Sequence, residues 1–312
     1  MGRLQIVGLG LTALDVLIRL ERMPTWETPA PVKSFALDGG GMVGTAMVAA
    51  AKLGARVGYV GIRGNDAVAR LKMQSLLDSG VDVDRVLTLS EPEPEVVFVY
   101  VDARSGERIF CGLEALRYDL YPPEALDRDY VTQAEYLLVD GFHYPAALQA
   151  ARWMREAGKT VVMDGAKSSG KPPAHRSELV GLVDILICGS GFAQGLTGLP
   201  DPMDACRATL DLGPRLVVQT VGEGGSYTVT QERAFHTPAF PVVVLDTTGA
   251  GDVFHGAYLV GLLHGWDLER VAQFATAVSA LKCAHLGGRA GIPSLPQAIG
   301  FLHQRGILWN ER

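Results

Sequence analysis

Short apolar runs alternate with helical patterns through the middle of the chain, and this alternation limits the possible folds more than any other feature. Residues 136–139, 160–163 and 216–220 have the length and the valine and leucine content of buried strands. Helical spacing follows at 146–157 and at about 201–212. Strands separated by helices pair in parallel, because the helix returns the chain to the same edge of the sheet. The pattern therefore predicts an α/β protein with a mostly parallel central sheet and helices on both faces.

Two earlier stretches interrupt this alternation. Residues 32–37 and 95–111 mix apolar and polar side chains, as expected for strands with one exposed face. Ala103-Arg104-Ser105-Gly106 lies between two apolar runs of the second stretch, a sequence typical of a hairpin turn. We expect these stretches to form a small β-sheet that projects from the main sheet as a lid, with lid segments at about 10–37 and 93–112.

The composition excludes several other classes of protein. The net charge is −6 and the pI about 5.7, so the chain lacks the general basic surface of a nucleic-acid-binding protein. Polar residues and glycine interrupt every apolar segment well before the ~20 residues of a membrane helix. Residues 1–10 lack the basic and apolar regions of a signal peptide, and the four cysteines form no CxxC pair. The chain is therefore predicted to be cytoplasmic, with no nucleic acid and no membrane as partner.

A glycine-rich segment ahead of a helix carries the strongest functional signal. It reads Asp-Thr-Thr-Gly-Ala-Gly-Asp-Val-Phe-His-Gly-Ala at residues 246–257 and leads into helical spacing at 253–263. The small residues Gly249, Ala250 and Gly251 let backbone amides approach a ligand at the amino end of the predicted helix. Such amides stabilise an anion, above all the charge that develops on a phosphoryl group during its transfer.

Asp252 lies in the first turn of this predicted helix, beside the same amides. A carboxylate at that place can accept the proton of a substrate hydroxyl while the hydroxyl attacks a phosphate. The alternative is that Asp252 only caps the helix and that the glycines only turn the chain. The twelve-residue pattern as a whole favours catalysis, with Asp252 as the general base.

Residues 246–257 resemble the signature of the ribokinase-like (PfkB) carbohydrate kinases, and the resemblance extends over nearly the whole chain. It implies a three-layer α/β/α ribokinase-like fold in a single kinase domain, residues 1–312. It also implies an enzyme that uses ATP and Mg²⁺ to phosphorylate a hydroxyl of a sugar or a sugar-like molecule. Members of the family act on sugars, sugar phosphates and nucleosides, so the motif names neither one sugar nor one hydroxyl.

The resemblance assigns substrate roles near the amino terminus. Asp15 lies where the family has an aspartate that binds substrate hydroxyls, and Gly40-Gly41 resembles its di-glycine element at the head of a helix. The residues expected to line the sugar side of the site are Asp15, Gly40, Gly41 and Thr45. The alternative for Asp15 is a turn or cap residue.

Two later segments resemble the nucleotide-binding elements of the family. Residues 220–226 resemble the strand and turn beside the nucleotide phosphates, and residues 287–291 resemble the glycine-rich loop near the adenine. The residues expected to contact the nucleotide are Thr220, Gly222, Gly224, Gly225 and Gly288. The family also has a monovalent-cation site, which implies K⁺ bound by the carbonyl groups of Asp246, Thr248 and Gly288.

Within the family, the sequence is most similar to the ketohexokinase and sulfofructose kinase branch. The shared residues are 246–257, 280–283 and 287–293. An arginine that would bind a sulfonate should lie near residues 140–144, where this sequence has Gly141-Phe142-His143. Sulfofructose is therefore not the favoured substrate.

The family's Asn-x-x-Glu motif, which is linked to magnesium and phosphate, is absent. Its place at residues 189–192 reads Gly-Ser-Gly-Phe. We expect Mg²⁺ to be held through water, by another carboxylate such as Asp164, or less tightly.

Two other functions compete with that of a kinase. The Gly8-x-Gly10 turn after the first strand matches a dinucleotide-binding fingerprint, typical of an NAD-dependent oxidoreductase. That function needs a helix beginning in the turn and an acidic residue at the end of the second strand, and residues 19–24 give no such strand. The second alternative is a non-catalytic sugar- or nucleotide-binding protein with the same fold, which the loss of Asn-x-x-Glu would allow.

Several charged and aromatic side chains have a plainer interpretation. Arg63, Lys72 and Arg108 are expected to be solvated surface charges, although Arg108 on the lid hairpin is within reach of a substrate. His143 and His255 are expected to pack or hydrogen-bond rather than to bind metal, because no cluster has zinc-like spacing. Unpaired strand edges in the lid favour a homodimer that forms through the lid.

Overall fold

A nine-stranded sheet forms the centre of the structure, a computed structural model that describes residues 2–309. The strand order is β13-β12-β11-β10-β9-β8-β1-β4-β5, and every pair is parallel except β11–β12 and β12–β13. These strands are β1 (Ile6–Leu9), β4 (Val57–Arg63), β5 (Asp82–Thr88), β8 (Tyr136–Val139), β9 (Thr160–Asp164), β10 (Ile185–Cys188), β11 (Leu216–Thr220), β12 (Ser226–Val229) and β13 (Ala234–Thr237). The predicted mostly parallel sheet is confirmed.

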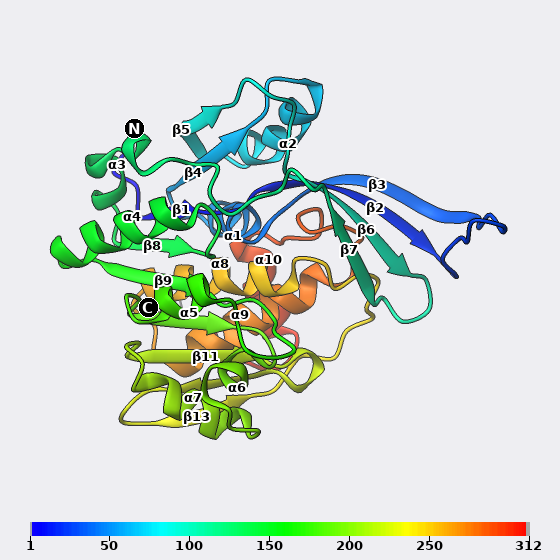
Figure 1. The fold of residues 1–312 in the computed structure, drawn as a ribbon. Coiled ribbons are helices and arrows are strands. Elements are labelled where there is room, and N and C mark those ends of the chain that lie inside the picture. Colours follow the sequence, from blue (N-terminus) through cyan, green and yellow to red (C-terminus); the bar gives the residue numbers. More distant parts are fainter. Residues whose placement is uncertain (1, 310–312) are drawn as a thin grey trace.

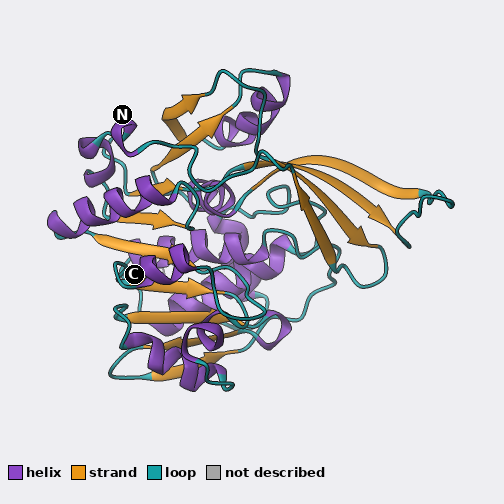
Figure 2. Ribbon diagram, in the orientation of Figure 1, coloured by secondary structure: helices purple, strands orange, loops and turns teal. Residues whose placement is uncertain are grey.

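Helices cover both faces of this sheet, as Figure 2 shows, so the predicted three-layer α/β/α fold is confirmed. One face packs against α1 (Met42–Lys52), α2 (Ala67–Asp78), α8 (Ala250–Leu263), α9 (Leu268–Lys282) and α10 (Leu295–His303). The other face packs against α3 (Arg128–Thr132), α4 (Tyr144–Glu156), α5 (Ala174–Val180), α6 (Phe192–Thr197) and α7 (Pro202–Leu210). Successive strand residues point to opposite faces, so Ile6 joins the first core and Val7 the second. None of the described helices is long and apolar enough to span a membrane.

A separate four-stranded sheet projects from the main body (Figure 1), and we call it the lid sheet. Its order is β3-β2-β6-β7, formed by β2 (Ala13–Leu20), β3 (Val32–Gly40), β6 (Val96–Asp102) and β7 (Arg108–Gly112). The predicted extra sheet is confirmed, although β3 continues past the predicted end of its lid segment as far as Gly40. Its function as a lid stays a prediction.

The turn between β1 and the lid sheet differs from a dinucleotide-binding turn. An NAD site needs a helix here, but the chain continues as the strand β2. Gly10 leaves room for a buried carboxylate, since a Cβ at this residue would lie 2.4 Å from Oδ1 of Asp140. Asp140 in turn accepts a hydrogen bond of 2.9 Å from the backbone N–H of Leu11. The glycine therefore serves the turn into the lid sheet, and the NAD interpretation is wrong.

Lys72 was expected at the surface, and this expectation is wrong. Its side chain is fully buried, and Nζ donates hydrogen bonds of 2.8 Å to the carboxylates of Glu93 and Glu95 and to the carbonyl of Ile62. Burial raises the pKa of Glu95 to about 8, against the opposing charge of Lys72. A buried charge persists only when it is paired, and loss of one partner typically costs about 3–5 kcal/mol. The cluster anchors the chain just before β6, at the root of the lid sheet.

The carboxyl ends of the parallel strands lie at one edge of the main sheet, where open α/β sheets bind their ligands. Asp164 is the last residue of β9, Thr220 is the last residue of β11, and Asp140 directly follows β8. The amino end of α8 reaches this same edge, since a histidine of its first turns contacts the carbonyl of Ile187 in β10. The fold thus brings the predicted anion site and three strand ends together.

Candidate active site

The glycine-rich loop and the start of α8 form the predicted anion site. Gly249 precedes the helix with φ 72°, and a Cβ there would lie 2.9 Å from Cα of Gly288. Gly251 has open space, since among residues 2–309 no heavy atom outside its chain neighbours and the backbone of its own helix lies within 4 Å of the place of its Cβ. The amides of a first helical turn have no carbonyl partner inside the helix, so they can face an anion. The N–H of Ala250 also donates to the carbonyl of Thr247 in the preceding loop, at 3.2 Å.

Two loops are tied together beneath this site. The Asp246 carboxylate accepts hydrogen bonds of 2.8 and 2.7 Å from the backbone N–H and the hydroxyl of Thr248, and one of 2.8 Å from the N–H of Gly287. The carbonyl of Cys283 accepts the N–H groups of Leu245 and Asp246 at 2.8 and 3.2 Å. The loop before α8 and the loop after α9 therefore hold each other in place.

Asp252 lies in the first turn of α8, as predicted, and it is partly exposed. Burial and the nearby charge of Asp164 raise the pKa of Asp252 to about 7, while His255 and Arg108 act to lower it. A carboxyl with such a pKa exchanges protons near neutral pH, which suits a general base.

His255 lies one turn further along α8 and hydrogen-bonds through both ring nitrogens, which confirms the prediction of a hydrogen-bonded histidine. Nδ1 lies 2.7 Å from the carbonyl oxygen of Gly251, and Nε2 lies 3.0 Å from that of Ile187. Carbonyl oxygens only accept, so both nitrogens donate when both bonds form, and the ring is then an imidazolium. Burial alone would lower the pKa of His255, but Asp164 and the two carbonyls raise it, and the net shift is upward.

Asp164, named as a possible magnesium ligand, lies beside this histidine. Its Oδ2 is 3.5 Å from Nδ1 of His255 and has no hydrogen-bond partner among residues 2–309. Its Oδ1 accepts the N–H of Ala166 at 2.7 Å. A buried carboxylate oxygen without a hydrogen bond is costly unless a cation or water satisfies it.

The predicted sugar-binding residues lie together where β2 and β3 meet α1. Asp15 is 4% exposed, and a Cβ on Gly40 would lie 2.2 Å from its carboxylate oxygens. Gly41 precedes α1 with φ 81°, a conformation that favours glycine. Burial raises the pKa of Asp15 to about 7, and the charge of Arg289 acts against this rise. The glycines thus make room for a carboxylate that titrates near neutral pH.

Arg289 joins these elements, and sequence reasoning assigned it no role. Its guanidinium is buried and donates to the hydroxyls of Thr45, Ser75 and Thr12 at 3.2, 2.6 and 2.7 Å and to the carbonyl of Gly40. A Cβ on Gly39 would lie 2.3 Å from this guanidinium. Arg289 therefore supports the wall of the Asp15 site from the late glycine-rich loop. Thr45 is fully buried and bonded to Arg289, and its contact with substrate stays a prediction.

The predicted nucleotide turn follows β11 at the same edge of the sheet. Gly222 and Gly225 have φ 62° and 89°, and the N–H of Val221 donates to the carbonyl of Gly225 at 2.8 Å. A Cβ on Gly225 would lie 2.0 Å from the carbonyl oxygen of Thr237. Gly222 and Gly224 are exposed, so the turn presents backbone rather than side chains to a ligand.

Arg108, on β7 of the lid sheet, reaches across to the glycine-rich segment. Its Nη1 donates a hydrogen bond of 2.5 Å to the hydroxyl of Thr247. Its charge also acts on the pKa of Asp252. The expectation of a solvated surface charge is wrong for Arg108. In the sequence, only its position on the predicted lid hairpin indicated that this side chain could reach the site.

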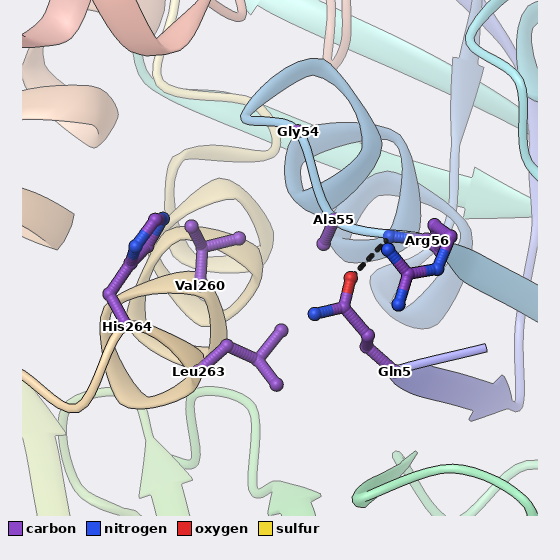
Figure 3. A pocket seen from close by; sticks show the side chains of 7 residues that line it. All are labelled: Gln5, Gly54, Ala55, Arg56, Val260, Leu263 and His264. Atoms are coloured by element: carbon purple, nitrogen blue, oxygen red, sulfur yellow. Dashed lines mark hydrogen bonds between the residues drawn. The ribbon is translucent and has the colours of Figure 1, made fainter. Parts of the chain in front are cut away.

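A hollow of about 220 Å³ lies elsewhere, at the opposite end of α8 (Figure 3). Val260 and Leu263 line it from the last turn of α8, together with His264, which follows the helix. Beside them, Gln5 accepts a hydrogen bond of 3.0 Å from the N–H of Arg56. Gln5 and Arg56 precede β1 and β4, so this hollow lies at the amino edge of the sheet. It is not part of the candidate site.

The sequence was compared with models of known protein families. The model of the pfkB family carbohydrate kinases matches residues 4–295. The chain belongs to the pfkB family. The enzyme class predicted from the sequence, a carbohydrate kinase, is thereby confirmed.

Three proteins of similar sequence or structure illustrate the comparison. An ATP-dependent ribose-1-phosphate kinase of Halopiger xanaduensis is 27% identical over 301 residues, which are 96% of this chain and 99% of the relative. The structure of Arabidopsis thaliana ribokinase complexed with ribose and ATP has a TM-score of 0.82 at 24% identity, over 97% and 99% of the two chains. A protein assigned as ribokinase II of E. coli, in complex with ATP and Mg²⁺, has a TM-score of 0.81 at 19% identity, over 96% and 99%. The ribokinase-like fold is confirmed, and the placement near ketohexokinase stays a prediction.

The two glycines that flank Ala250 should respond differently to substitution. We expect Gly249→Ala to lower the free energy of unfolding by about 1–3 kcal/mol, because alanine is strained at positive φ and its Cβ meets Gly288. Gly251→Ala has open space and should change it by less than about 1 kcal/mol, in the stabilising direction. Urea unfolding monitored by circular dichroism measures both, and equal losses for the two variants would contradict the loop geometry.

Proposed function

We propose that this carbohydrate kinase transfers the terminal phosphoryl group of ATP to a hydroxyl of a sugar or a sugar-like molecule, with Asp252 as the general base. The observation that carries the proposal is the position of Asp252, one residue after the unobstructed Gly251 and in the first turn of α8. There the carboxylate accepts the hydroxyl proton while the amides of Gly249, Ala250 and Gly251 stabilise the transferring phosphoryl group. The pKa of about 7 provides a base at neutral pH.

The nucleotide fits between the turn after β11 and the late glycine-rich loop. Exposed backbone at Gly222 and Gly224 and the close approach of Gly288 to Gly249 support contacts to ATP by main-chain groups. The residues proposed to bind the nucleotide are Thr220, Gly222, Gly224, Gly225 and Gly288. The E. coli relative forms a complex with ATP and Mg²⁺, in line with this cofactor pair.

Asp164 is the residue that fits Mg²⁺ in place of the missing Asn-x-x-Glu motif. Its buried Oδ2 accepts no hydrogen bond from the part of the chain that the structure describes, although it lies 3.5 Å from Nδ1 of His255, and it is an oxygen ligand of the kind that Mg²⁺ prefers, directly or through water. A bound Mg²⁺ would neutralise charge on the phosphate oxygens. The charge of Asp164 also raises the pKa of Asp252, so the same residue tunes the base.

The sugar fits on the other side of Asp252, against Asp15, Gly40 and Gly41. The Asp15 carboxyl can hydrogen-bond substrate hydroxyls, and the di-glycine lets the sugar approach the backbone. Arg289 supports this wall, and Arg108 would close over the phosphate from the lid sheet.

An ADP-release assay over ketoses, aldonic acids, polyols, nucleosides and sugar phosphates identifies the substrate class. Ribose phosphates belong in this panel because the Halopiger relative is a ribose-1-phosphate kinase. The cytoplasmic location stays a prediction.

The outer face of the lid sheet supports a homodimer. Cross-strand pairing places Phe35, Ile18, Tyr100 and Ile109 in one row on one face. Phe35 and Ile109 are 59% and 57% exposed, while Leu17, Val99 and Val101 on the opposite face are buried. An apolar row on a two-fold-related copy is self-complementary, so we propose that a second copy of this chain covers this face.

Substitution of the base should separate chemistry from binding. Asp252→Asn should lower kcat by about 10²–10⁴-fold, because it removes proton transfer, while calorimetry still detects ATP binding. In the wild type, kcat/KM should fall as the pH drops below about 7, since only the deprotonated carboxylate accepts a proton. Asp211→Asn, an exposed carboxylate at the end of α7, is the control. Near-normal turnover of Asp252→Asn would remove Asp252 from this role.

Asp15 should affect the sugar and not the nucleotide. Asp15→Ala removes a hydrogen-bonding partner of the substrate hydroxyls and should raise the sugar KM by about tenfold or more, with little change in the ATP KM. Asp15→Asn, which keeps size and hydrogen bonding, should fall between this variant and the wild type. Steady-state kinetics with each substrate varied in turn provide the test, and a rise in the ATP KM alone would place Asp15 outside the sugar site.

The dimer should depend on the lid face. Ile109→Glu places a charge at the β7 end of the exposed row and should shift the chain from dimer to monomer in sedimentation velocity. Leu77→Glu, an equally exposed apolar residue on α2, is the matched control and should leave the dimer intact. A wild-type monomer, or a dimer that tolerates Ile109→Glu, would rule out this interface.

A further inference from the structure

A lysine ammonium is hydrogen-bonded to a carbonyl oxygen that the sequence analysis predicted to bind potassium. The carbonyl oxygen of Asp246 was expected to bind K⁺, but it accepts a hydrogen bond of 2.9 Å from Nζ of Lys282. Lys282 is the last residue of α9, and its side chain is fully buried. A second cation on the same oxygen would meet like-charge repulsion at short range. The residues present therefore do not fit K⁺ at Asp246.

The Lys282 ammonium has an acceptor and two carboxylates close to it, which act against the cost of its burial. The pKa of Lys282 is lowered by burial, while the carboxylates of Asp246 and Asp38 act to raise it. The Asp246 carboxylate is engaged with Thr248 and Gly287, so the contact of Lys282 with this residue is to its carbonyl. Carbonyl oxygens are also the ligands that proteins use for K⁺. A buried ammonium at this place repeats the chemistry of a bound monovalent ion.

The position of Lys282 couples it to the reacting groups. Asp246 begins the loop that carries Gly249 to Gly251, and Lys282 precedes the loop that carries Gly288. The charge of Lys282 also acts against the rise in the pKa of Asp15, which burial causes. Lys282 thus holds the two loops around the anion site and adds positive charge beside it, as a monovalent cation between the loops would.

We propose that Lys282 is a built-in monovalent cation, a positioning residue that makes phosphoryl transfer by this enzyme independent of K⁺. The proposal rests on the kinase function proposed above. Because the ammonium is covalently tethered, it needs no ion from solution to order the loop before α8.

The wild-type enzyme gives the first test and needs no variant. The protein is purified in tetramethylammonium salts, free of K⁺, Na⁺ and NH₄⁺, and ADP release is measured with the best substrate of the panel. We expect the rate to change less than about twofold when K⁺ replaces tetramethylammonium at constant ionic strength, since the cation is already present. Activation of about tenfold or more by K⁺ would overturn the proposal.

Two substitutions at Lys282 give a matched pair. Lys282→Ala removes the ammonium and leaves space for an ion, so kcat should fall by about 10–10³-fold and recover in part with K⁺ or NH₄⁺. Lys282→Met removes the charge but fills the space, so the loss should persist in both salts. Lys159→Met, at the opposite edge of the sheet, should behave as wild type. Full activity of Lys282→Ala without K⁺, or equal responses of the two variants to K⁺, would contradict a cation role.

A thermal melt separates this proposal from the kinase proposal. We expect K⁺ to raise the melting temperature of Lys282→Ala above that in tetramethylammonium, and to leave wild type and Lys282→Met unchanged, because only the alanine variant has an empty cation site. This readout needs no substrate, so it stands even where no sugar in the panel is phosphorylated. The proposal would be refuted if K⁺ raised the melting temperature of the wild type, or if K⁺ left the melting temperature of Lys282→Ala unchanged.

Discussion

The candidate site depends on the tie between the loop before α8 and the loop after α9. The Asp246 carboxylate accepts hydrogen bonds from Thr248 and Gly287, one residue from each loop. Gly249 can then approach Gly288 so closely that a Cβ on Gly249 would lie 2.9 Å from Cα of Gly288. Without this tie, the amide groups at the start of α8 would have no fixed relation to the nucleotide loop, and an anion site needs fixed donors.

Around this tie, acidic and basic groups balance each other at close range. Asp15 and Asp252 both have a pKa near 7, because burial and neighbouring carboxylates disfavour their charged forms. The compensating cations come from separate elements of the fold: His255 from α8, Arg108 from the lid sheet and Arg289 from the late loop. Such an arrangement leaves a carboxylate basic enough to take a proton while the site as a whole accepts a phosphate.

The lid sheet contributes to two surfaces at once. Its inner face carries Asp15 and Arg108 toward the reacting groups, and its outer face presents an exposed apolar row. The buried cluster of Lys72, Glu93 and Glu95 fixes the root of β6, so motion of the lid sheet would begin beyond that point. Because both faces belong to one sheet, a homodimer through the outer face would also stabilise the inner face, which we propose contacts the substrate.

The sequence by itself determined the main fold and predicted the centre of the candidate site. Alternation of apolar runs and helices identified the parallel sheet, and the segment 246–257 identified Gly249, Gly251 and Asp252, because both signals depend on residues that are neighbours in the chain. The edge strands β5 and β13 escaped prediction, since their half-exposed residues lack a clear period, and so did the four-residue strand β12 beside β13. Only the tertiary structure decided the roles of Lys72, Lys282 and Arg289, whose charges are balanced by partners distant in sequence. A lysine or an arginine looks like a surface residue until folding brings those partners to it.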